Sequence, residues 1–309
     1  MFNQEIKEKY LATRTGRTAK DAETILDMFE EMEANFGIDI AEMSLDQLGA
    51  CLESRHFVEP TALRNITDML SSYANWYHDG DKHAHHIREY RLEDYPYAEN
   101  LRPTLFHSAE ELLYVLRQVY DFDSGQPAIP ALCFAWLGID SPSALKLKKE
   151  QVDTVAGRIY NDDGECIVET MPEIIREVLD IYSKTYRAER TQSQTFTVYA
   201  DDQGLFIRRM ITINSQKAGK PISTAQLATW IAELRRTYES EFGPCPALNY
   251  TNVQRSGNFY RLHELAKSGV DVRSLKNKEL VRSILGKSKR YHKDNMIMYD
   301  AYLTCIGEK

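Results

Sequence analysis

The sequence lacks any apolar run long enough to span a bilayer, and its first ten residues, MFNQEIKEKY, lack the apolar core of a signal peptide. It also lacks a cysteine framework, because its five cysteines are scattered, odd in number and never in a CxxC spacing. It has no internal repeat and no low-complexity tract. These absences argue against membrane, secreted disulfide-rich and solenoid proteins, and they favour free thiols in a reducing cytoplasm.

What is present is an ordinary globular composition, with 43% hydrophobic and 27% charged residues. A length of 309 residues is enough for two domains, at roughly 150 residues for each.

Positive charge is scarce overall but locally concentrated. The net charge is −8, yet residues 205–294 hold 17 Lys and Arg against 7 Asp and Glu, a balance of +10. Residues 1–204 hold 20 Lys and Arg against 37 Asp and Glu, a balance of −17. Because phosphate binding follows local charge, the basic block is a candidate site for a polyanion, with a solvated basic surface as the alternative.

The first eighty residues read as a small helical domain. Apolar residues recur at helical spacing over 18–36, and Gly37 is expected to end that helix. A further helix begins after the cap residue Ser44, and another begins at Pro60 and ends near residue 79. A fourth helix is expected near the N-terminus.

Residues 81–105, rich in His, Asp and Tyr, have no clean apolar period and are interpreted as a linker. Residues 106–309 are expected to form a mostly helical second domain with one small sheet. Its hairpin turns at Asp162-Asp163-Gly164, and helices begin at the cap residues Ser108 and Ser223. The predicted class is mainly α with a small β-sheet.

Three stretches, taken in order, resemble motifs of the tyrosine recombinase (phage integrase) superfamily. They are ALCFAWLGIDSPSALKLKKEQVD, NVQRSGNFYRLHELAKSGVDV and SILGKSKRYHKDNMIMYDAY, at 131–153, 252–272 and 283–302. The resemblance spans nearly the whole chain. It implies a helical core-binding domain in residues 1–80 and a catalytic-like α+β domain in residues 106–309.

The chemistry of that family places two arginines, a His or Trp, a lysine and a nucleophilic tyrosine around one phosphate. At the turn of the first arginine this chain has the acid Asp140, and the hairpin that would present the lysine reads NDDGE, at 161–165. An acid at these places repels a phosphate.

The remaining positions are only partly kept. Arg255 has the spacing of the H-x-x-R motif, but Asn252 replaces its histidine, and Lys287 replaces the histidine of the later box. Met296 stands where the nucleophile is expected, and Tyr299 and Tyr302 follow one and two helical turns later. The sequence therefore predicts that the fold is kept and recombinase activity is lost, so that Arg255 holds a phosphate and no residue is catalytic.

Within the superfamily the sequence resembles the catalytically inactive, recombinase-like lysogeny repressors (MrpR type) of SP-beta-like Bacillus phages. This resemblance implies a prophage-encoded transcriptional repressor that occupies double-stranded operator DNA. Such a protein works in the cytoplasm of the bacterial host, on the nucleoid when bound, without a cofactor, a metal or a membrane.

Two alternatives stay open. A divergent but active integrase would use Tyr299 or Tyr302, with a second arginine and a lysine converging beside that tyrosine. A protein that kept the fold but binds another protein through its acidic half would show no salt-sensitive affinity for DNA. A protein regulator and self-association are further partners that the sequence leaves open.

Most of the basic residues expected beside DNA lie in a loop, next to a turn or at a helix terminus, where a side chain reaches a phosphate. Arg208 and Arg209 follow an extended segment, and Arg64 lies on the third helix, from which it is expected to reach a major groove. For each one, an exposed charge without a specific partner is the alternative. The candidates are Arg14, Arg17, Lys20, Arg64, Arg208, Arg209, Lys217, Lys220, Arg255, Arg261 and Lys287. The stretch HDGDKHAHH, at 78–86, has side chains able to bind a metal, but its spacing matches no closed zinc site, and a polar linker is the favoured interpretation.

Overall fold

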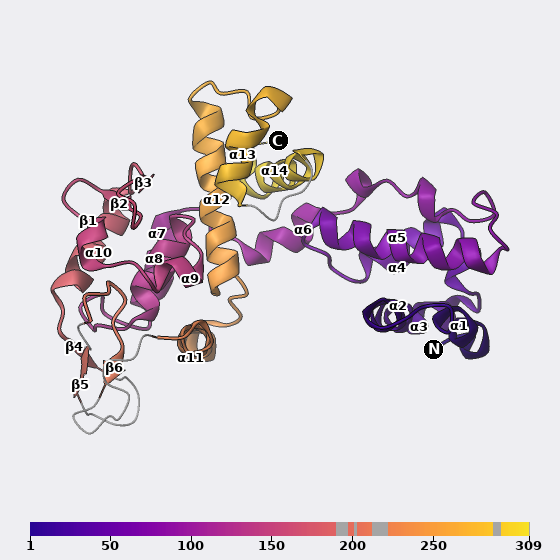
Figure 1. Cartoon of the computed structure of the whole chain (residues 1–309), viewed down its shortest axis with the longest axis horizontal. Coiled ribbons are helices and arrows are strands. Elements are labelled where there is room, and N and C mark those ends of the chain that lie inside the picture. The colour runs from indigo at the N-terminus through magenta and orange to yellow at the C-terminus, as the bar shows by residue number, and fades with distance from the viewer. Residues whose placement is uncertain (190–196, 201–202, 212–221, 287–291, 309) are drawn as a thin grey trace. The chain divides into compact units, whose positions relative to one another are not determined.

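The computed structural model describes residues 1–189, 197–200, 203–211, 222–286 and 292–308 (Figure 1). The chain forms two compact units. Unit 1 comprises Met1–Leu101 and Lys293–Lys309, and unit 2 comprises Arg102–His292. The predicted mainly helical class is confirmed, with two small sheets in place of the one expected. None of the helices in the described residues has the length and apolar character needed to cross a membrane.

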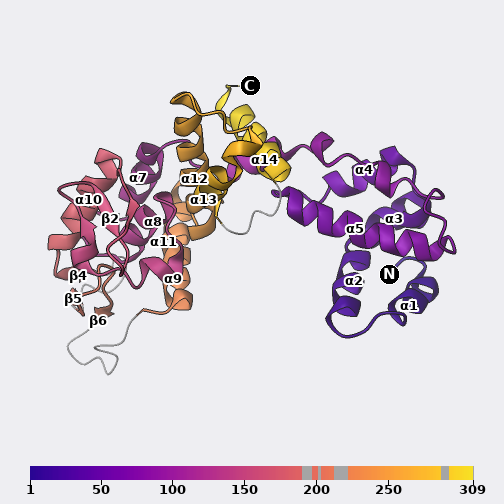
Figure 2. The ribbon, with the colours of Figure 1, turned by 45° about the horizontal axis from the view of Figure 1, so that its top comes forward.

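Unit 1 is built around the long helix α5 (Pro60–Tyr77), with the other N-terminal helices packed against it (Figure 2). Ser44 forms a capping box with Gln47, and Gly37 ends a helix in the left-handed conformation at φ +69°, both as predicted. These other helices are α1 (Gln4–Leu11), α2 (Arg17–Met28), α3 (Glu30–Phe36), η1 (Ile40–Glu42) and α4 (Leu45–Glu53).

The helix expected over 18–36 is divided in two at Phe29, which has φ −104° and ψ 0°. The ring of Phe29 is fully buried, and the guanidinium of Arg55 lies 5.6 Å from its centroid. Backbone hydrogen bonds continue on both sides of the break, from the Phe29 N–H to the carbonyl of Leu26 at 3.3 Å and from the Glu33 N–H to the carbonyl of Phe29 at 3.0 Å.

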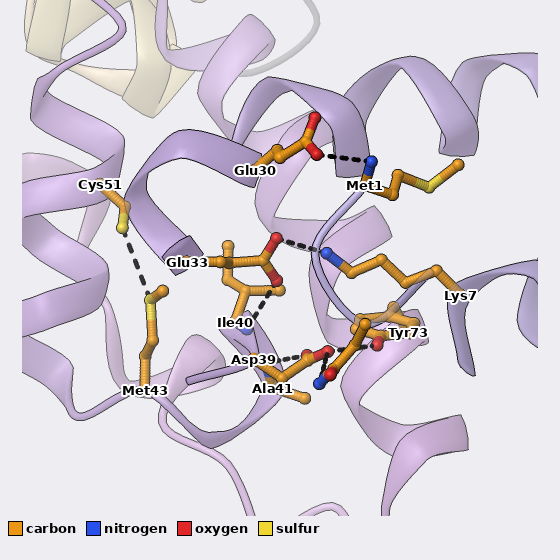
Figure 3. A network of polar contacts seen from close by, with 11 residues as sticks. Met1, Lys7, Glu30, Glu33, Asp39, Ile40, Ala41, Met43, Cys51 and Tyr73 are labelled. Atoms are coloured by element: carbon orange, nitrogen blue, oxygen red, sulfur yellow. Dashed lines mark hydrogen bonds and ion pairs between the residues drawn. The ribbon is translucent and has the colours of Figure 1, made fainter. Parts of the chain in front are cut away.

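A buried polar network ties α1 and α3 to the chain before α4 (Figure 3). The ammonium group of Lys7 pairs with the carboxylate of Glu33, and both side chains are fully buried. Glu33 also accepts a hydrogen bond of 2.9 Å from the backbone N–H of Ile40. Beside this pair, Asp39 accepts from the hydroxyl of Tyr73 at 2.9 Å. Burial raises the pKa of Glu33, although Lys7 and the Ile40 N–H act to lower it.

In the region 81–105, which was predicted to be a linker, residues up to Leu101 pack into unit 1. Ile87, Tyr95 and Tyr97 are buried there, and they anchor η2 (Ile87–Glu89), η3 (Leu92–Asp94) and α6 (Tyr97–Leu101). The units nevertheless divide between residues 101 and 102, inside the predicted boundary region.

The C-terminal helix α14 (His292–Ile306) also departs from the predicted domain 106–309, because residues 293–309 belong to unit 1. The buried carboxylate of Asp294 lies 2.5 Å from the Nη2 of Arg64 on α5. Lys293 pairs with Glu93, and the Cys305 thiol donates to the carbonyl of Ala98 at 3.3 Å. These contacts are 200 or more residues apart in the sequence, so local patterns give no sign of them.

Unit 2 is centred on α8 (Ala128–Trp136), all nine residues of which are buried. A helix that is apolar on every side belongs in the middle of a domain. In both views α12 (Tyr250–Lys267) stands against α8, with the small sheets on the other side of α8 (Figures 1 and 2). The other helices are η4 (Arg102–Thr104), α7 (Ala109–Arg117), α9 (Ser141–Ala144), η5 (Lys149–Gln151), α10 (Glu173–Lys184), α11 (Thr224–Phe242), η6 (Leu275–Asn277) and α13 (Lys278–Leu285).

The first sheet has the antiparallel order β1-β2-β3, with strands Val152–Asp153, Arg158–Tyr160 and Cys166–Val168. Its predicted hairpin is confirmed, with Gly164 at φ +79°. The second sheet, in the order β4-β5-β6, comprises Arg187–Glu189, Thr197–Ala200 and Met210–Ile211. Strands of two to four residues are too short to show an alternating pattern, which is why the sequence predicted a single sheet.

Candidate nucleic-acid interface

Arg255 lies in the second turn of α12, where a local network fixes its side chain. Asn249 caps the helix and accepts from the Asn252 backbone N–H at 2.9 Å. The side chain of Asn252 accepts from Arg255 Nη1 at 2.9 Å and donates to the carbonyl of Pro246 at 2.8 Å. Asn252 therefore orients the half-buried guanidinium of Arg255, and this gives the asparagine a positioning role in place of the histidine of the family motif.

The carbonyl groups at the end of α8 are capped by side chains of α12. Tyr250 donates to the carbonyl of Ile139 at 2.9 Å, and Gln254 donates to that of Gly138 at 2.9 Å. Arg261 donates to the carbonyl of Trp136 at 2.9 Å. Helix ends leave carbonyls without intrahelical partners, so these three bonds fix α12 against α8.

Arg261 was predicted to contact DNA, and in the structure its guanidinium faces the end of α8. Its second Nη donates to Asn258 at 2.6 Å, and the group lies close against Gly138, where an added Cβ would come within 2.0 Å of it. Burial lowers the pKa of Arg261 to about 10. Its guanidinium is occupied in holding two helices together.

A substitution at Arg261 tests whether this residue stabilises the fold or binds DNA. Replacing it with Lys removes the planar fork that serves Trp136 and Asn258, and we expect the free energy of unfolding to fall by about 1–3 kcal/mol. Chemical denaturation of the full chain measures this loss. A variant with unchanged stability and weakened DNA binding would instead support the predicted contact of Arg261 with DNA.

Arg208 and Arg209, two further residues predicted to lie beside DNA, are buried in the structure. The Nη2 of Arg208 donates to the carbonyl of Tyr182 at 2.5 Å, and its guanidinium lies 4.7 Å from the centroid of the Tyr182 ring. The ring of Tyr186 covers it from 5.5 Å. Arginine stacks on aromatic rings in this way, so a charged side chain can be drawn into the core.

The N-terminal candidates are divided between paired and exposed positions. Arg14 donates to the hydroxyls of Tyr10 and Ser72, at 2.9 and 2.6 Å, and Arg64 is paired with Asp294. Arg17 and Lys20 are exposed in the first turn of α2 and are placed as predicted for phosphate contacts, which nothing in the structure tests. The predicted contacts Lys217, Lys220 and Lys287 lie outside the described residues.

A group of exposed basic residues that was not singled out by the sequence follows Arg255 along the chain. It runs from the end of α12 through η6 into α13. Helices α12 and α13 pack on each other. Its members are Lys267, Arg273, Lys276, Lys278 and Arg282, accompanied by the exposed acids Glu264, Asp271 and Glu279. The charge imbalance of 205–294 was the signal for this group, but charge alone does not distinguish its members from buried arginines.

The acidic positions have structural explanations of their own. Asp140 caps α9 by accepting from the Ser143 N–H at 2.8 Å, a role that an arginine cannot fill. In the turn between β2 and β3, Asp162 Oδ1 accepts from Gln151 Nε2 at 3.3 Å, and Glu165 Oε2 accepts from Asn161 Nδ2 at 3.0 Å. The acidic side chains at both places therefore have local hydrogen-bond partners, one at a helix cap and the others in a turn.

Tyr299 and Tyr302, the two tyrosines nearest to the expected nucleophile, are 3% and 1% exposed. Their rings stack with centroids 6.4 Å apart, and both are carried by α14 in unit 1. A tyrosine must expose its hydroxyl to attack a phosphate, and these two are packed as core residues.

The histidine-rich stretch forms ordinary polar contacts. His78 Nε2 lies 3.1 Å from the Ala41 carbonyl, and His85 Nε2 lies 3.1 Å from Asn75 Oδ1. In the part of the chain that the structure describes, no three His, Cys, Asp or Glu residues are grouped so as to hold a metal ion.

Residues 1–79 match the family model described as the MrpR N-terminal core-binding domain. The match ends one residue before the predicted boundary at residue 80. It confirms the predicted core-binding domain and, through that domain, the resemblance to recombinase-like proteins of the MrpR type. The chain matches no curated protein.

Among solved structures, the chain is similar to the Tn1549 transposon integrase. One such structure, in complex with transposon right end DNA, is 11% identical with a TM-score of 0.43, and 98% of each chain is covered. Another, in complex with a circular intermediate DNA, is 10% identical with a TM-score of 0.44, again with 98% of each chain covered.

Proposed function

We propose that this chain is a sequence-specific double-stranded DNA-binding protein that acts as a transcriptional repressor of a prophage and carries out no strand transfer. Its core-binding domain of the MrpR type supports the DNA-binding part of the proposal. The exposed basic residues from Lys267 to Arg282 and the oriented Arg255 supply positive groups for backbone phosphates.

The proposed loss of catalysis is supported by the side chains found at the positions where the recombinase motifs have catalytic residues. Of those groups, Arg255 is held in place by Asn252, whereas Asp140 caps a helix and the turn 161–165 is acidic. Removing a single group that stabilises the transition state costs on the order of 3 kcal/mol in comparable sites. Losing several together leaves binding as the function that the remaining groups support.

Arg255 is expected to be a backbone contact. Replacing it with Ala should weaken DNA binding by about tenfold and lower the slope of log affinity against log salt concentration by about 0.9. Fluorescence anisotropy of a labelled operator duplex over a salt series measures both quantities. Arg176→Ala on α10 is the matched control, since that arginine pairs with Glu173 at 3.2 Å and should leave both unchanged. Unchanged affinity in Arg255→Ala would remove this residue from the interface.

The absence of strand transfer is tested on a nicked duplex that traps covalent protein–DNA adducts. We expect no adduct from the wild-type chain, because Tyr299 and Tyr302 are both buried and the acidic positions disfavour a phosphate. An adduct that disappears in Tyr299→Phe or Tyr302→Phe would instead identify an active integrase. Genome-wide capture of bound DNA then tests the repressor role, for which a short motif recurring at several promoters is expected.

A further inference from the structure

A polar pocket of about 490 Å³ lies in unit 1 along α5, and the chain from Ile87 to Leu92 forms part of its lining. Arg64, Asp68, Ser71, Ser72 and Asn75 contribute to it from α5. Their spacing of three and four residues places them on one face of the helix. This volume is in the range of small-ligand sites.

Two serine hydroxyls in the pocket are held as hydrogen-bond donors. Ser71 Oγ accepts from the Nε of Arg88 at 3.0 Å, and Ser72 Oγ accepts from the Nη2 of Arg14 at 2.6 Å. A hydroxyl that accepts from a guanidinium keeps its own O–H for a second partner. Within the described residues neither O–H has an acceptor, and Ser71 is only 8% exposed.

The other polar groups of the lining are mostly donors as well. Asn75 uses its Oδ1 toward His85, at 3.1 Å, which leaves its amide N–H groups to donate. The buried hydroxyl of Tyr90 has no partner among the residues described. Arg88 adds an exposed guanidinium, and Asp68, also exposed, is the carboxylate of the lining. A surplus of donors with one acid calls for a ligand that accepts hydrogen bonds and carries a small negative charge.

We propose that this pocket binds a phosphate group, whose oxygens accept hydrogen bonds from the hydroxyls of Ser71 and Ser72 and from the guanidinium of Arg88. Arginine and hydroxyl groups together suit phosphate geometry. Asp68 repels further negative charge, which favours a single phosphate over a polyphosphate chain. The phosphate belongs either to the DNA backbone or to a phosphorylated small molecule, and only the first source rests on the proposed function.

Binding of free phosphate is tested on the full chain by titration calorimetry with inorganic phosphate, with chloride at equal ionic strength as the reference. We expect saturable binding that Arg88→Met and Ser71→Ala weaken about tenfold or more. Arg91→Met is the matched control. It removes the same charge three residues away, from a side chain that is 72% exposed and lies outside the pocket lining, and it should bind phosphate as the wild type does.

The DNA source is tested with the same variants by measuring duplex affinity over a salt series. A salt slope lowered by about 0.9 in Arg88→Met but not in Arg91→Met assigns the pocket to a backbone phosphate. Saturable phosphate binding with an unchanged salt slope assigns it to a small molecule. If Arg88→Met changes neither quantity, or if Arg91→Met changes them equally, the proposal is overturned. A wild-type chain that binds phosphate but no DNA would defeat the proposed function and leave this site standing.

Discussion

Replacing Gly257 with Ala should destabilise unit 2 by about 3 kcal/mol or more, because the helices α12 and α8 meet at this glycine. A Cβ at residue 257 would lie 1.9 Å from the carbonyl oxygen of Trp136 and 2.6 Å from its carbonyl carbon. These are backbone atoms of a fully buried helix, which has no rotamer with which to make room. The two helices would have to move apart, and the bond from Arg261 to the carbonyl of Trp136 would be stretched at the same time.

Gly49→Ala is the matched control, since Gly49 is also a helical glycine but has space around it. The nearest atom to an added Cβ there is Cε2 of Tyr90, at 3.7 Å, an ordinary contact. Alanine is a better helix former than glycine, so this variant should gain about 0.5–1 kcal/mol. Thermal unfolding followed by circular dichroism compares the two. Equal stability of Gly257→Ala and the wild type would mean that α12 and α8 do not approach as closely as described.

Replacing Lys7 with Met should lower the free energy of unfolding of unit 1 by about 3–5 kcal/mol, because it leaves the carboxylate of Glu33 buried without its partner. The two side chains face each other (Figure 3), and both are fully excluded from water in the folded chain. Denaturant unfolding of the full chain measures the loss, read by tryptophan fluorescence in a background where Trp136 and Trp230 are replaced by Phe, so that Trp76 in α5 reports on unit 1. A change below 1 kcal/mol would mean that Glu33 reaches water or takes up a proton at little cost.

The double variant Lys7→Met, Glu33→Gln separates the charge from the packing. It should recover much of the lost stability, because a neutral amide can still accept from the Ile40 N–H. The folded pKa of Glu33 is raised, so its contribution to stability is complete below the pKa of an unfolded glutamate, about 4.3, and is lost as pH rises through the raised value. The double variant should lack this loss of stability with rising pH.

Element ends were predicted well where neighbouring residues alone determine them. Ser44, Ser108 and Ser223 each cap a helix by accepting from an N–H three residues later, as their sequence context indicates. Gly37 ends α3 because a left-handed residue at that place is inexpensive only for glycine. The prediction of one unbroken helix over 18–36 failed at Phe29, whose ring is buried in the core.

The sequence by itself determined the helical class, the N-terminal core-binding domain, and the presence of Asp140 and Asn252 where the recombinase motifs have an arginine and a histidine, because these depend on residue identity and short spacing. Only the tertiary structure decided which basic residues are available to a ligand. Arg208 has the same charge as Arg255, yet it is buried against Tyr182, 26 positions away, and Arg261 is bound to the carbonyl of Trp136, 125 positions away. The tertiary structure also decided the place of Arg88, because it brings this side chain to Ser71, which lies 17 residues earlier on α5. The solvation of a charged side chain depends on the groups that the fold packs around it. Residue spacing along the chain does not predict that packing.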